Sequence, residues 1–195
     1  MRTVWSSDRR SQAEGASARA AVHGLQASRG ARSLRLYRPL LLTAAIVVLI
    51  DQLTKSWALT RLRGGRSIDI IEGALSLRLT FNPGGAFGFG KEFPEFFLVA
   101  TIVVIITIVA WVGRTGEVGL VIPLGLVLGG GTGNLVDRLF RGFDGQVVDF
   151  IDPHVWPVFN VADSCIVIGV GLVLLQGFIG AGDGEPAGEA GPGSG

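Results

Sequence analysis

Four long apolar runs, separated by polar segments, dominate the pattern along the chain. They cover residues 40–59, 96–112, 118–133 and 162–179. Each is close to the ~20 residues that a helix needs to cross the hydrocarbon core of a bilayer. The pattern therefore predicts an α-helical membrane protein with four transmembrane helices. The first and third runs contain polar or glycine-rich positions, so we expect these two helices to line the interior.

The long segment between the first two runs carries strand signals. Residues 76–81 alternate between polar and apolar side chains, and a mostly apolar run, residues 68–71, precedes Glu72 and Gly73. Alternation around a glycine turn predicts a small hairpin or β-sheet that lies on the membrane surface as a platform. Residues 82–88 are rich in glycine, and they would either let a ligand approach the backbone closely or form a plain turn.

The composition supports a membrane protein and separates one domain from two polar ends. The mean hydropathy is +0.49 and 48% of the residues are hydrophobic, more than a soluble domain of this size needs for its core. Residues 1–36 are basic and lack the apolar stretch of a signal peptide, so we expect a disordered cytoplasmic extension. Residues 180–195 are expected to be a disordered tail. Residues 37–179 remain as one membrane domain.

The charge pattern bears on topology and partners. An even number of spans places both termini on one side. Arginines precede the first span, but Arg61, Arg63 and Arg66 follow it. Because basic residues tend to stay in the cytoplasm, the two groups favour opposite orientations of this span. We place both termini in the cytoplasm, which puts the two long polar loops, and with them the site, on the extracytoplasmic face. The net charge of +1 and the lack of a basic patch exclude nucleic acid as an expected partner.

Charged residues interrupt the first apolar run. Asp51 and Lys55 are four residues apart, so their side chains can meet on a helix. They either neutralise each other or form a polar anchor for a neighbouring catalytic or binding group, and charge inside a membrane favours the anchor. In the third run Gly125, Gly129 and Gly133 recur at every fourth residue, which predicts close helix packing.

Polar residues follow the third apolar run on the same predicted helix. Asn134 and Asp137 share a face at a spacing of three residues. Arg138 is adjacent to Asp137, and we expect the two to form an ion pair with a supporting role.

Two further aspartates lie before and at the start of the fourth run. Asp149 lies in the apolar, strand-forming residues 147–151, so burial should raise the pKa of its carboxyl. Asn160 and Asp163 have the spacing of a capping box at a helix start, where the helix dipole favours a negative charge. The pair could therefore act as an acid and a base that split an amide with water, with Asp163 as base and Asp149 as acid or the reverse. Asp152 precedes Pro153 and is expected at a turn.

The remaining reactive side chains give no competing site. Cys165 is the single cysteine, so an internal disulfide is excluded, and its apolar helical context is typical of a packing residue. A pair with His154 would lack a third orienting group. His23 and His154 are isolated in the sequence and no cluster has zinc spacing, so neither a metal nor an organic cofactor is expected.

Five short sequence motifs, in a fixed order along the chain, together resemble those of a known protein family. They are DQLTK at 51–55, NPGGAFG at 82–88, GNLVDR at 133–138, VVDF at 147–150 and FNVADS at 159–164. Together they resemble the lipoprotein signal peptidase (signal peptidase II) family of membrane aspartic peptidases. The resemblance implies that Asp149 and Asp163 are catalytic. The supporting or substrate-binding residues that it implies are Asp51, Lys55, Asn82, Gly84, Asn134, Asp137, Arg138 and Asn160. Pro83 and Gly85 depart from the family's more usual Asn-Thr-Gly-Ala-Ala-Phe motif.

The resemblance also implies a reaction. The enzyme would hydrolyse one peptide bond, just before a diacylglyceryl-modified cysteine in a prolipoprotein, as a monomer among membrane lipids and without a cofactor. Two other classes remain open from the residues. Carboxylates in a membrane also make proton- or cation-coupled transporters, although four spans without a duplicated half argue against one. A lipid- or lipoprotein-binding module that uses the surface sheet is the third.

Overall fold

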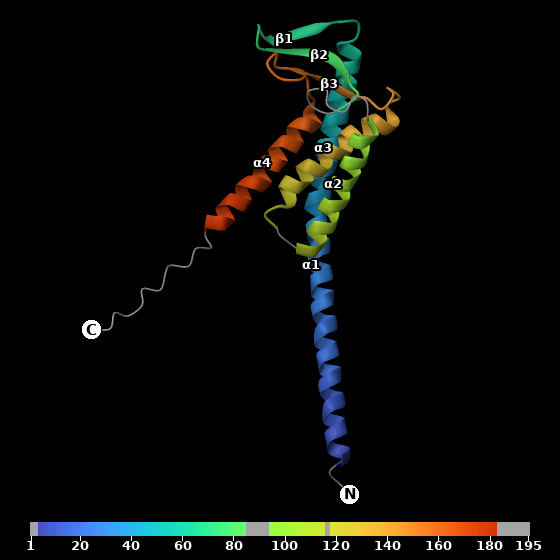
Figure 1. The fold of residues 1–195 in the computed structure, drawn as a ribbon, viewed down its shortest axis with the longest axis vertical. Helices are drawn as coiled ribbons and strands as arrows, with labels where there is room; N and C mark the ends of the chain where they lie inside the picture. The colour runs from blue at the N-terminus through green and yellow to red at the C-terminus, as the bar shows by residue number, and fades with distance from the viewer. Residues whose placement is uncertain (1–3, 85–93, 116–117, 183–195) are drawn as a thin grey trace, which may run out of the picture.

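The computed structural model describes residues 4–84, 94–115 and 118–182, and within them it shows helices that extend from a small sheet (Figure 1). The helices are α1 (Val4–Arg61), α2 (Pro94–Thr115), α3 (Val121–Phe140) and α4 (Val161–Gly182). The strands are β1 (Ser67–Ile71), β2 (Leu75–Asn82) and β3 (Val147–Asp152). The sheet lies at the end of α1 where that helix meets the other elements, and the long first part of α1 projects away on the opposite side.

The N-terminal segment differs from the sequence-based expectation. We expected disorder through residue 36, but α1 begins at Val4 and continues through Pro39 to Arg61. The segment is rich in Ala and Arg, which have high helix propensity, so it can extend the helix of the first span. The tail expected from residue 180 begins inside α4, and residues 183–195 lie outside the described part of the chain. The division into three regions stays a prediction.

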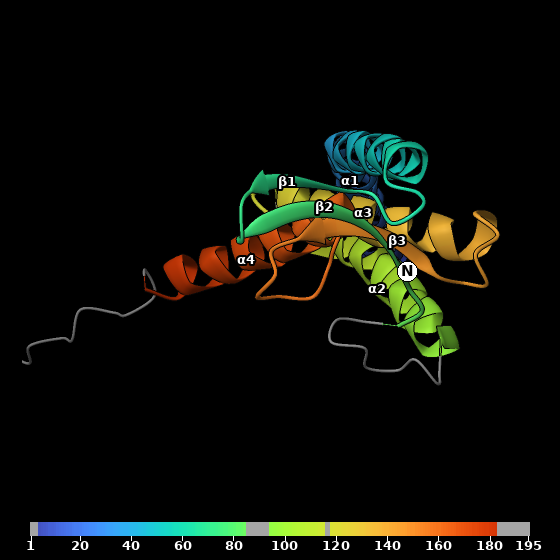
Figure 2. The same ribbon diagram turned by 90° about the horizontal axis from the view of Figure 1, so that it is seen from above.

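The predicted hairpin is present and gains a third strand. β1 pairs antiparallel with β2, and β2 pairs antiparallel with β3, in the order β1-β2-β3. Thr80 lies opposite Asp149 and Asn82 lies opposite Val147. Figure 2 shows the sheet from above, passing over the ends of the helices. The pairing of β2 with β3 therefore brings the residues around Asn82 next to those around Asp149.

The repeated glycines of α3 allow it to lie directly against α1. A Cβ atom added at Gly125 would be 2.8 Å from Thr43, and one at Gly129 would be 2.7 Å from Val47. At Gly133 the added atom would be 2.6 Å from an oxygen of Asp51. These distances are too short for a side chain, so the predicted small-residue face is confirmed, and it brings the backbone of α3 against the polar part of α1.

Several charged side chains are buried and many apolar side chains are exposed, although an apolar core that includes Leu40, Val112 and Leu128 is also present. The carboxylates of Asp51 and Asp137 and the ammonium of Lys55 are completely buried, whereas Leu42 and Leu53 on α1 are more than half exposed. Within the described residues, two helical segments are long and apolar enough to cross a bilayer: Arg35–Arg61 and Val161–Ile179. A shorter apolar segment, Leu98–Val112, lies in α2. Exposed apolar helix faces around buried charge are what a lipid environment requires.

Candidate active site

The two candidate catalytic aspartates line the same pocket. This pocket has a volume of about 630 Å³ and is open to the surface. Its polar lining residues include Asn82, Gly84, Asn134, Arg138, Asp149 and Asp163. Its apolar lining residues include Val147, Trp156, Pro157, Val158, Phe159, Ile166 and Val167. The pocket thus combines two carboxyl groups with a wall that can hold an apolar ligand.

Asp163 is fixed by the capping box that the sequence predicted. The backbone N–H of Asp163 donates to Oδ1 of Asn160 at 3.0 Å, and the backbone N–H of Asn160 donates to Oδ2 of Asp163 at 3.2 Å. The other carboxylate oxygen of Asp163 accepts a hydrogen bond of 2.8 Å from Nδ2 of Asn134. Both oxygens therefore have a donor, and the carboxylate is oriented at the first turn of α4.

Asp149 occupies a different environment. It lies in β3 with a side chain that is only 1% exposed. Burial, together with the negative charge of Asp163, raises the pKa of the Asp149 carboxyl to about 7, against hydrogen bonds from Asn82 and Asn160 that lower it. Those bonds run from Nδ2 of Asn82 to Oδ2 at 2.9 Å and from Nδ2 of Asn160 to Oδ1 at 2.7 Å. Asp149 can therefore hold a proton near neutral pH, as the sequence predicted.

Two asparagines connect the aspartates. Asn160 bonds to Asp149 through its side chain and to Asp163 through both its backbone and its side chain. Asn134 accepts a hydrogen bond from Nδ2 of Asn160 at 3.1 Å while it donates to Asp163. Because each amide has one acceptor and one donor end, these contacts fix which way both amides point.

Lys55 neutralises the carboxylates of Asp51 and Asp137, which lie beneath this network. Its Nζ atom lies 2.9 Å from Oδ2 of Asp51 and 2.9 Å from Oδ2 of Asp137. It also donates to Oδ1 of Asn134 at 2.9 Å. The three contacts use the three protons of the ammonium group, so a completely buried lysine is fully satisfied. The i, i+4 pair of Asp51 and Lys55 is therefore part of a larger anchor and not only a self-neutralising pair.

The two aspartates paired with Lys55 each hold the backbone next to one pocket aspartate. Oδ1 of Asp51 accepts a hydrogen bond of 3.0 Å from the N–H of Ala162, the residue before Asp163. Oδ2 of Asp137 accepts one of 3.1 Å from the N–H of Val148, the residue before Asp149. Through these bonds α1 and α3 set the positions of the start of α4 and of β3.

The expected ion pair between Asp137 and Arg138 is replaced by other contacts of Asp137. Besides Lys55, Asp137 pairs with Arg141 at 2.7 Å. Adjacent residues on a helix point to different faces, whereas residues four apart lie on the same face. Arg138 instead reaches the pocket, where Nη2 donates to the carbonyl oxygen of Gly84 at 3.3 Å.

Sequence reasoning missed two members of the network. Nη2 of Arg141 donates to the side-chain oxygen of Gln52 at 2.9 Å and to its backbone oxygen at 3.1 Å. Nε2 of Gln52 in turn donates to Oδ1 of Asp137 at 3.1 Å and to the carbonyl oxygen of Gly133 at 3.1 Å. The spacing of four residues between Asp137 and Arg141 was a signal that could have identified the arginine.

The glycine-rich loop is only partly described. The N–H of Gly84 donates to Oδ1 of Asn82 at 3.0 Å, so this asparagine holds the loop start with its oxygen and Asp149 with its nitrogen. Gly85 to Gly88 lie outside the described residues.

The sulfur and imidazole groups do not form a second site around the thiol. Cys165 is a free, partly buried residue of α4. Nε2 of His154 lies 3.0 Å from Oγ of Ser76, and its backbone N–H donates to Asp152. Over the described residues, no group of three or more His, Cys, Asp or Glu side chains is arranged to hold a metal ion.

The fold and the site are those of a membrane-embedded aspartic hydrolase, with one buried and one partly buried carboxyl group beside an apolar wall. A family model described as signal peptidase (SPase) II matches residues 43–179. The chain belongs to this family, and it is a membrane aspartic peptidase of bacterial type.

Relatives and solved structures support the same assignment. The lipoprotein signal peptidase of Streptomyces griseus is 40% identical over 164 residues, which cover 83% of this chain and 82% of the relative. That of Rhodococcus jostii is 42% identical over 145 residues, or 72% of this chain and 73% of the relative. A solved bacterial membrane enzyme at 2.3 Å resolution is similar with a TM-score of 0.69 and 30% identity, and the match covers 76% of this chain and 93% of the other.

Proposed function

We propose that this peptidase removes the signal peptide from diacylglyceryl-modified prolipoproteins by cleaving the bond before the lipidated cysteine. Asp149 and Asp163 would be the catalytic pair, and a water molecule would be the nucleophile. The observation that carries the proposal is that both carboxyl groups line one pocket, and that burial together with its charged neighbour raises the pKa of Asp149 to about 7. Two carboxyl groups with different proton affinities are the means by which an acid and a base act together.

The proposed reaction needs no covalent intermediate. The Asp163 carboxylate takes a proton from water as the oxygen attacks the carbonyl carbon of the scissile amide. Protonated Asp149 donates to the carbonyl oxygen, which becomes the hydroxyl of a tetrahedral intermediate. When this intermediate collapses, the bond from carbon to nitrogen breaks and the leaving amine takes the proton held by Asp163, while one hydroxyl of the intermediate returns its proton to Asp149 and becomes the carbonyl oxygen of the new carboxyl group. The products are a signal peptide with a new carboxyl end and a lipoprotein with a free amine on its modified cysteine.

The supporting residues would position these groups. Lys55, Asp51 and Asp137 hold the segments that carry the two aspartates, and Asn134 and Asn160 orient the carboxyl groups. Arg138 contacts the Gly84 carbonyl at the pocket wall, and Asn82 holds both Asp149 and the loop start. Asn82, Gly84 and Arg138 are therefore the proposed contacts to the peptide on the side of β2.

The apolar wall suits a lipidated substrate. Trp156, Phe159, Ile166 and Val167 line the pocket beside the aspartates, and Val167 is exposed on α4, which is itself a candidate span. Burial of acyl chains contributes about 0.8 kcal/mol per CH₂ group. Acyl chains in the membrane would therefore bring the modified cysteine to the pocket from the bilayer, and membrane lipids would surround a monomeric enzyme.

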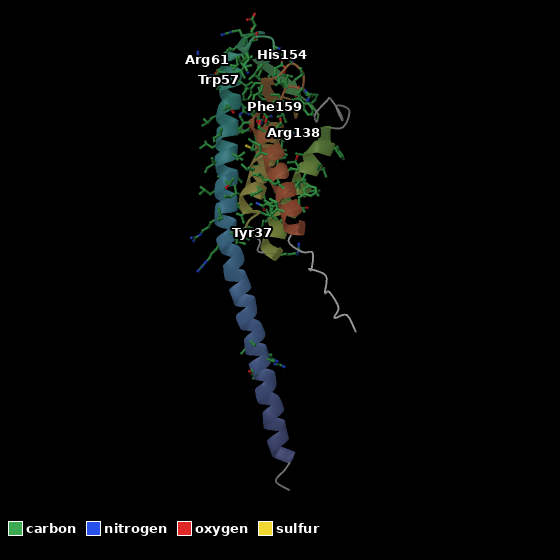
Figure 3. All side chains as sticks on the ribbon, turned by 90° about the vertical axis from the view of Figure 1, so that its left-hand side faces the viewer. Tyr37, Trp57, Arg61, Arg138, His154 and Phe159 are labelled. Carbon is green, nitrogen blue, oxygen red and sulfur yellow. The ribbon has the colours of Figure 1, made fainter. Side chains whose placement is uncertain are left out.

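The proposed topology has four spans formed by α1, α2, α3 and α4. Both termini would be cytoplasmic, and the sheet and the pocket would lie toward the extracytoplasmic face. One membrane domain, residues 37–179, would contain the whole site. Figure 3 supports the geometry, because Arg138 and Phe159 lie toward the sheet, whereas Tyr37 lies farther from it, at the level where the shorter helices end.

A cleavage assay with paired substrates tests the proposal. The purified protein is incubated with a prolipoprotein that carries the diacylglyceryl group and with the same chain bearing an unmodified cysteine. Cleavage of the modified substrate alone, with the new amine on the lipidated cysteine, is the expected result. Intact modified substrate after incubation with a well-folded protein would contradict the proposed cleavage. Cleavage of both substrates at equal rates would show that the enzyme does not require the diacylglyceryl group. A covalent peptidyl-enzyme intermediate would exclude the direct attack by water.

A further inference from the structure

A second pocket is lined by the turn between α1 and β1 and by part of β2. It has a volume of about 560 Å³ and is lined by residues 62–67 together with Arg78, Leu79 and Phe81. None of these residues lines the pocket that contains Asp149 and Asp163. The second pocket is therefore separate from the peptidase site, and the proposed proteolytic function does not account for it.

Arginines provide the polar part of this pocket. Arg63, Arg66 and Arg78 line it, and Arg61 ends the adjacent helix. Arg63 and Arg66 are exposed, and within the described residues neither forms an ion pair or a side-chain hydrogen bond. Arg78 pairs through Nε with Asp152, and 52% of its side chain stays exposed. Two unpaired guanidinium groups and one that is held in place favour a ligand with negative charge.

The backbone explains why these arginines face one cavity. Gly64 and Gly65 have φ angles of +77° and +75°. Residues with side chains rarely adopt this left-handed conformation, whereas glycine adopts it without strain. The two glycines turn the chain between the end of α1 and the start of β1, so Arg63 and Arg66 lie on either side of the turn and line the same pocket.

The location of the pocket indicates the source of the ligand. Leu62, which is buried in the pocket floor, directly follows Arg61, the last residue of a helix that is long and apolar enough to cross a bilayer. In Figure 3 Arg61 lies at the sheet end of α1. The end of a spanning helix lies at the level of lipid phosphates, and Leu79 and Phe81 give the pocket an apolar side.

We propose that this pocket binds the phosphate of an anionic phospholipid headgroup. Three arginines would contact the phosphate oxygens, and the apolar side chains would contact the glycerol and the upper acyl chain. The segment Arg61–Asn82 carries four arginines against Asp69 and Glu72, so it has net positive charge. The negative charge of the bound lipid would offset the positive charge of the arginines that follow the first span. Without such a ligand, these arginines oppose a topology with a cytoplasmic N-terminus.

Native mass spectrometry of the full-length protein in a neutral detergent tests this site. The protein is titrated with dioleoyl phosphatidylglycerol and, separately, with dioleoyl phosphatidylcholine. The double variant R63Q/R66Q is compared with R35Q/R38Q, which removes the same charge from exposed positions at the other end of the span. Two arginines at about 1 kcal/mol each correspond to about a thirtyfold loss of affinity. We expect this loss for phosphatidylglycerol in R63Q/R66Q and no change in R35Q/R38Q, with phosphatidylcholine bound more weakly throughout.

Other results would contradict the proposal that this pocket binds an anionic phospholipid. Equal losses in the two double variants would mean that only net charge matters, and equal affinity for the two lipids would remove the selectivity for an anionic headgroup. Inorganic phosphate is added as a competitor at the same concentration as the lipid. Displacement of the lipid by phosphate alone would assign the pocket to a free anion. Thermal unfolding of both variants verifies that they are folded, and because the readout is lipid binding, the result does not depend on peptidase activity.

Discussion

Asp149 and Asp163 carry the same functional group in unlike surroundings. Asp149 is buried in a strand, with amide donors from Asn82 and Asn160, whereas Asp163 lies in the first turn of a helix and receives a backbone N–H. The difference comes from the local sequence: an apolar run around one residue and a capping box around the other. At the residue scale, the predictions concern the protons that these two carboxyl groups would donate and accept during cleavage.

Replacing either pocket aspartate by asparagine should nearly abolish signal peptide cleavage. D149N cannot donate the proton and D163N cannot accept one, so the turnover rate should fall by about a hundredfold to ten-thousandfold. D152N is a matched control, because Asp152 is also a buried carboxylate of β3 but pairs with Arg78 and lies outside the pocket lining. Cleavage rates measured on folded variants decide the matter. Comparable losses in D152N would show that the strand, and not the acid, is what the reaction requires.

The pH dependence of cleavage should show the proton on Asp149. Because its pKa is raised to about 7, the carboxyl is protonated below neutral pH and loses its proton as the pH rises through that value. If Asp149 acts as the acid, kcat/KM should fall about tenfold per pH unit above this point. The two carboxyl groups interact, so the profile reports apparent values for the pair. A value of kcat/KM that rises from pH 7 to pH 9 would contradict the assignment.

At the scale of elements, α1 contains a candidate span and also supports the site. Its polar residues Asp51 and Lys55 contact α3 and the start of α4. Some of its apolar residues, such as Leu42 and Leu53, are exposed, whereas Leu40 is buried in the core. The glycines of α3 make this contact possible by bringing the two helices together. Changes in α1 or α3 should therefore affect stability as well as activity.

Removing the buried cation should destabilise the fold strongly. K55M keeps the length of the side chain, but it leaves Asp51 and Asp137 without their shared partner. Losing one partner of a buried ion pair costs about 3–5 kcal/mol. R38M is the control, because Arg38 is an exposed cation of the same helix. Thermal unfolding in detergent should separate the two variants clearly, and a change in K55M no larger than that in R38M would show that the network contributes little to stability.

Filling the helix contact should also be unfavourable. The Cβ of G129A would be 2.7 Å from Val47 and 2.8 Å from the carbonyl oxygen of Ala44, so α1 and α3 would have to separate. Such overpacking costs about 1–3 kcal/mol. G171A on α4 is the matched control, because nothing lies within 4 Å of its added atom and alanine favours helix. Equal melting temperatures for the two variants would argue against a close α1–α3 contact.

The elements and contacts that were predictable from the sequence are the local ones. The capping box at Asn160 spans three residues, the pair of Asp51 and Lys55 spans four, and β2 alternates in side-chain character. The bond from Ala162 to Asp51 joins residues 111 apart, and that from Arg141 to Gln52 joins residues 89 apart. No spacing rule connects such positions, because they meet only when the helices have packed. The family resemblance named the participants but not their bonds.

For the whole molecule, the orientation in the membrane is the main prediction. With four spans, both termini should lie in the cytoplasm and the loop after β2 should lie outside. Reporter fusions test this: green fluorescent protein should fluoresce when fused at Gly195, and alkaline phosphatase should be active when fused after Gly142, in the loop before β3. The arginines after the first span make the test informative, since they favour the reverse orientation. Active phosphatase at Gly195 would exclude an even number of spans with a cytoplasmic start.

The contacts that Lys55 makes with both Asp51 and Asp137 have a consequence for when the enzyme becomes active during its synthesis. In the proposed topology Lys55 would enter the membrane with α1, Asp137 would follow with α3, and Asp163 would come last with α4. A chain that is still being synthesised therefore holds an incomplete set of partners and has no working pair of aspartates. With Asp149 and Asp163 as the proposed catalytic pair, peptidase activity would appear only when α4 is in place, so the nascent chain would not cut membrane neighbours before its own folding is complete.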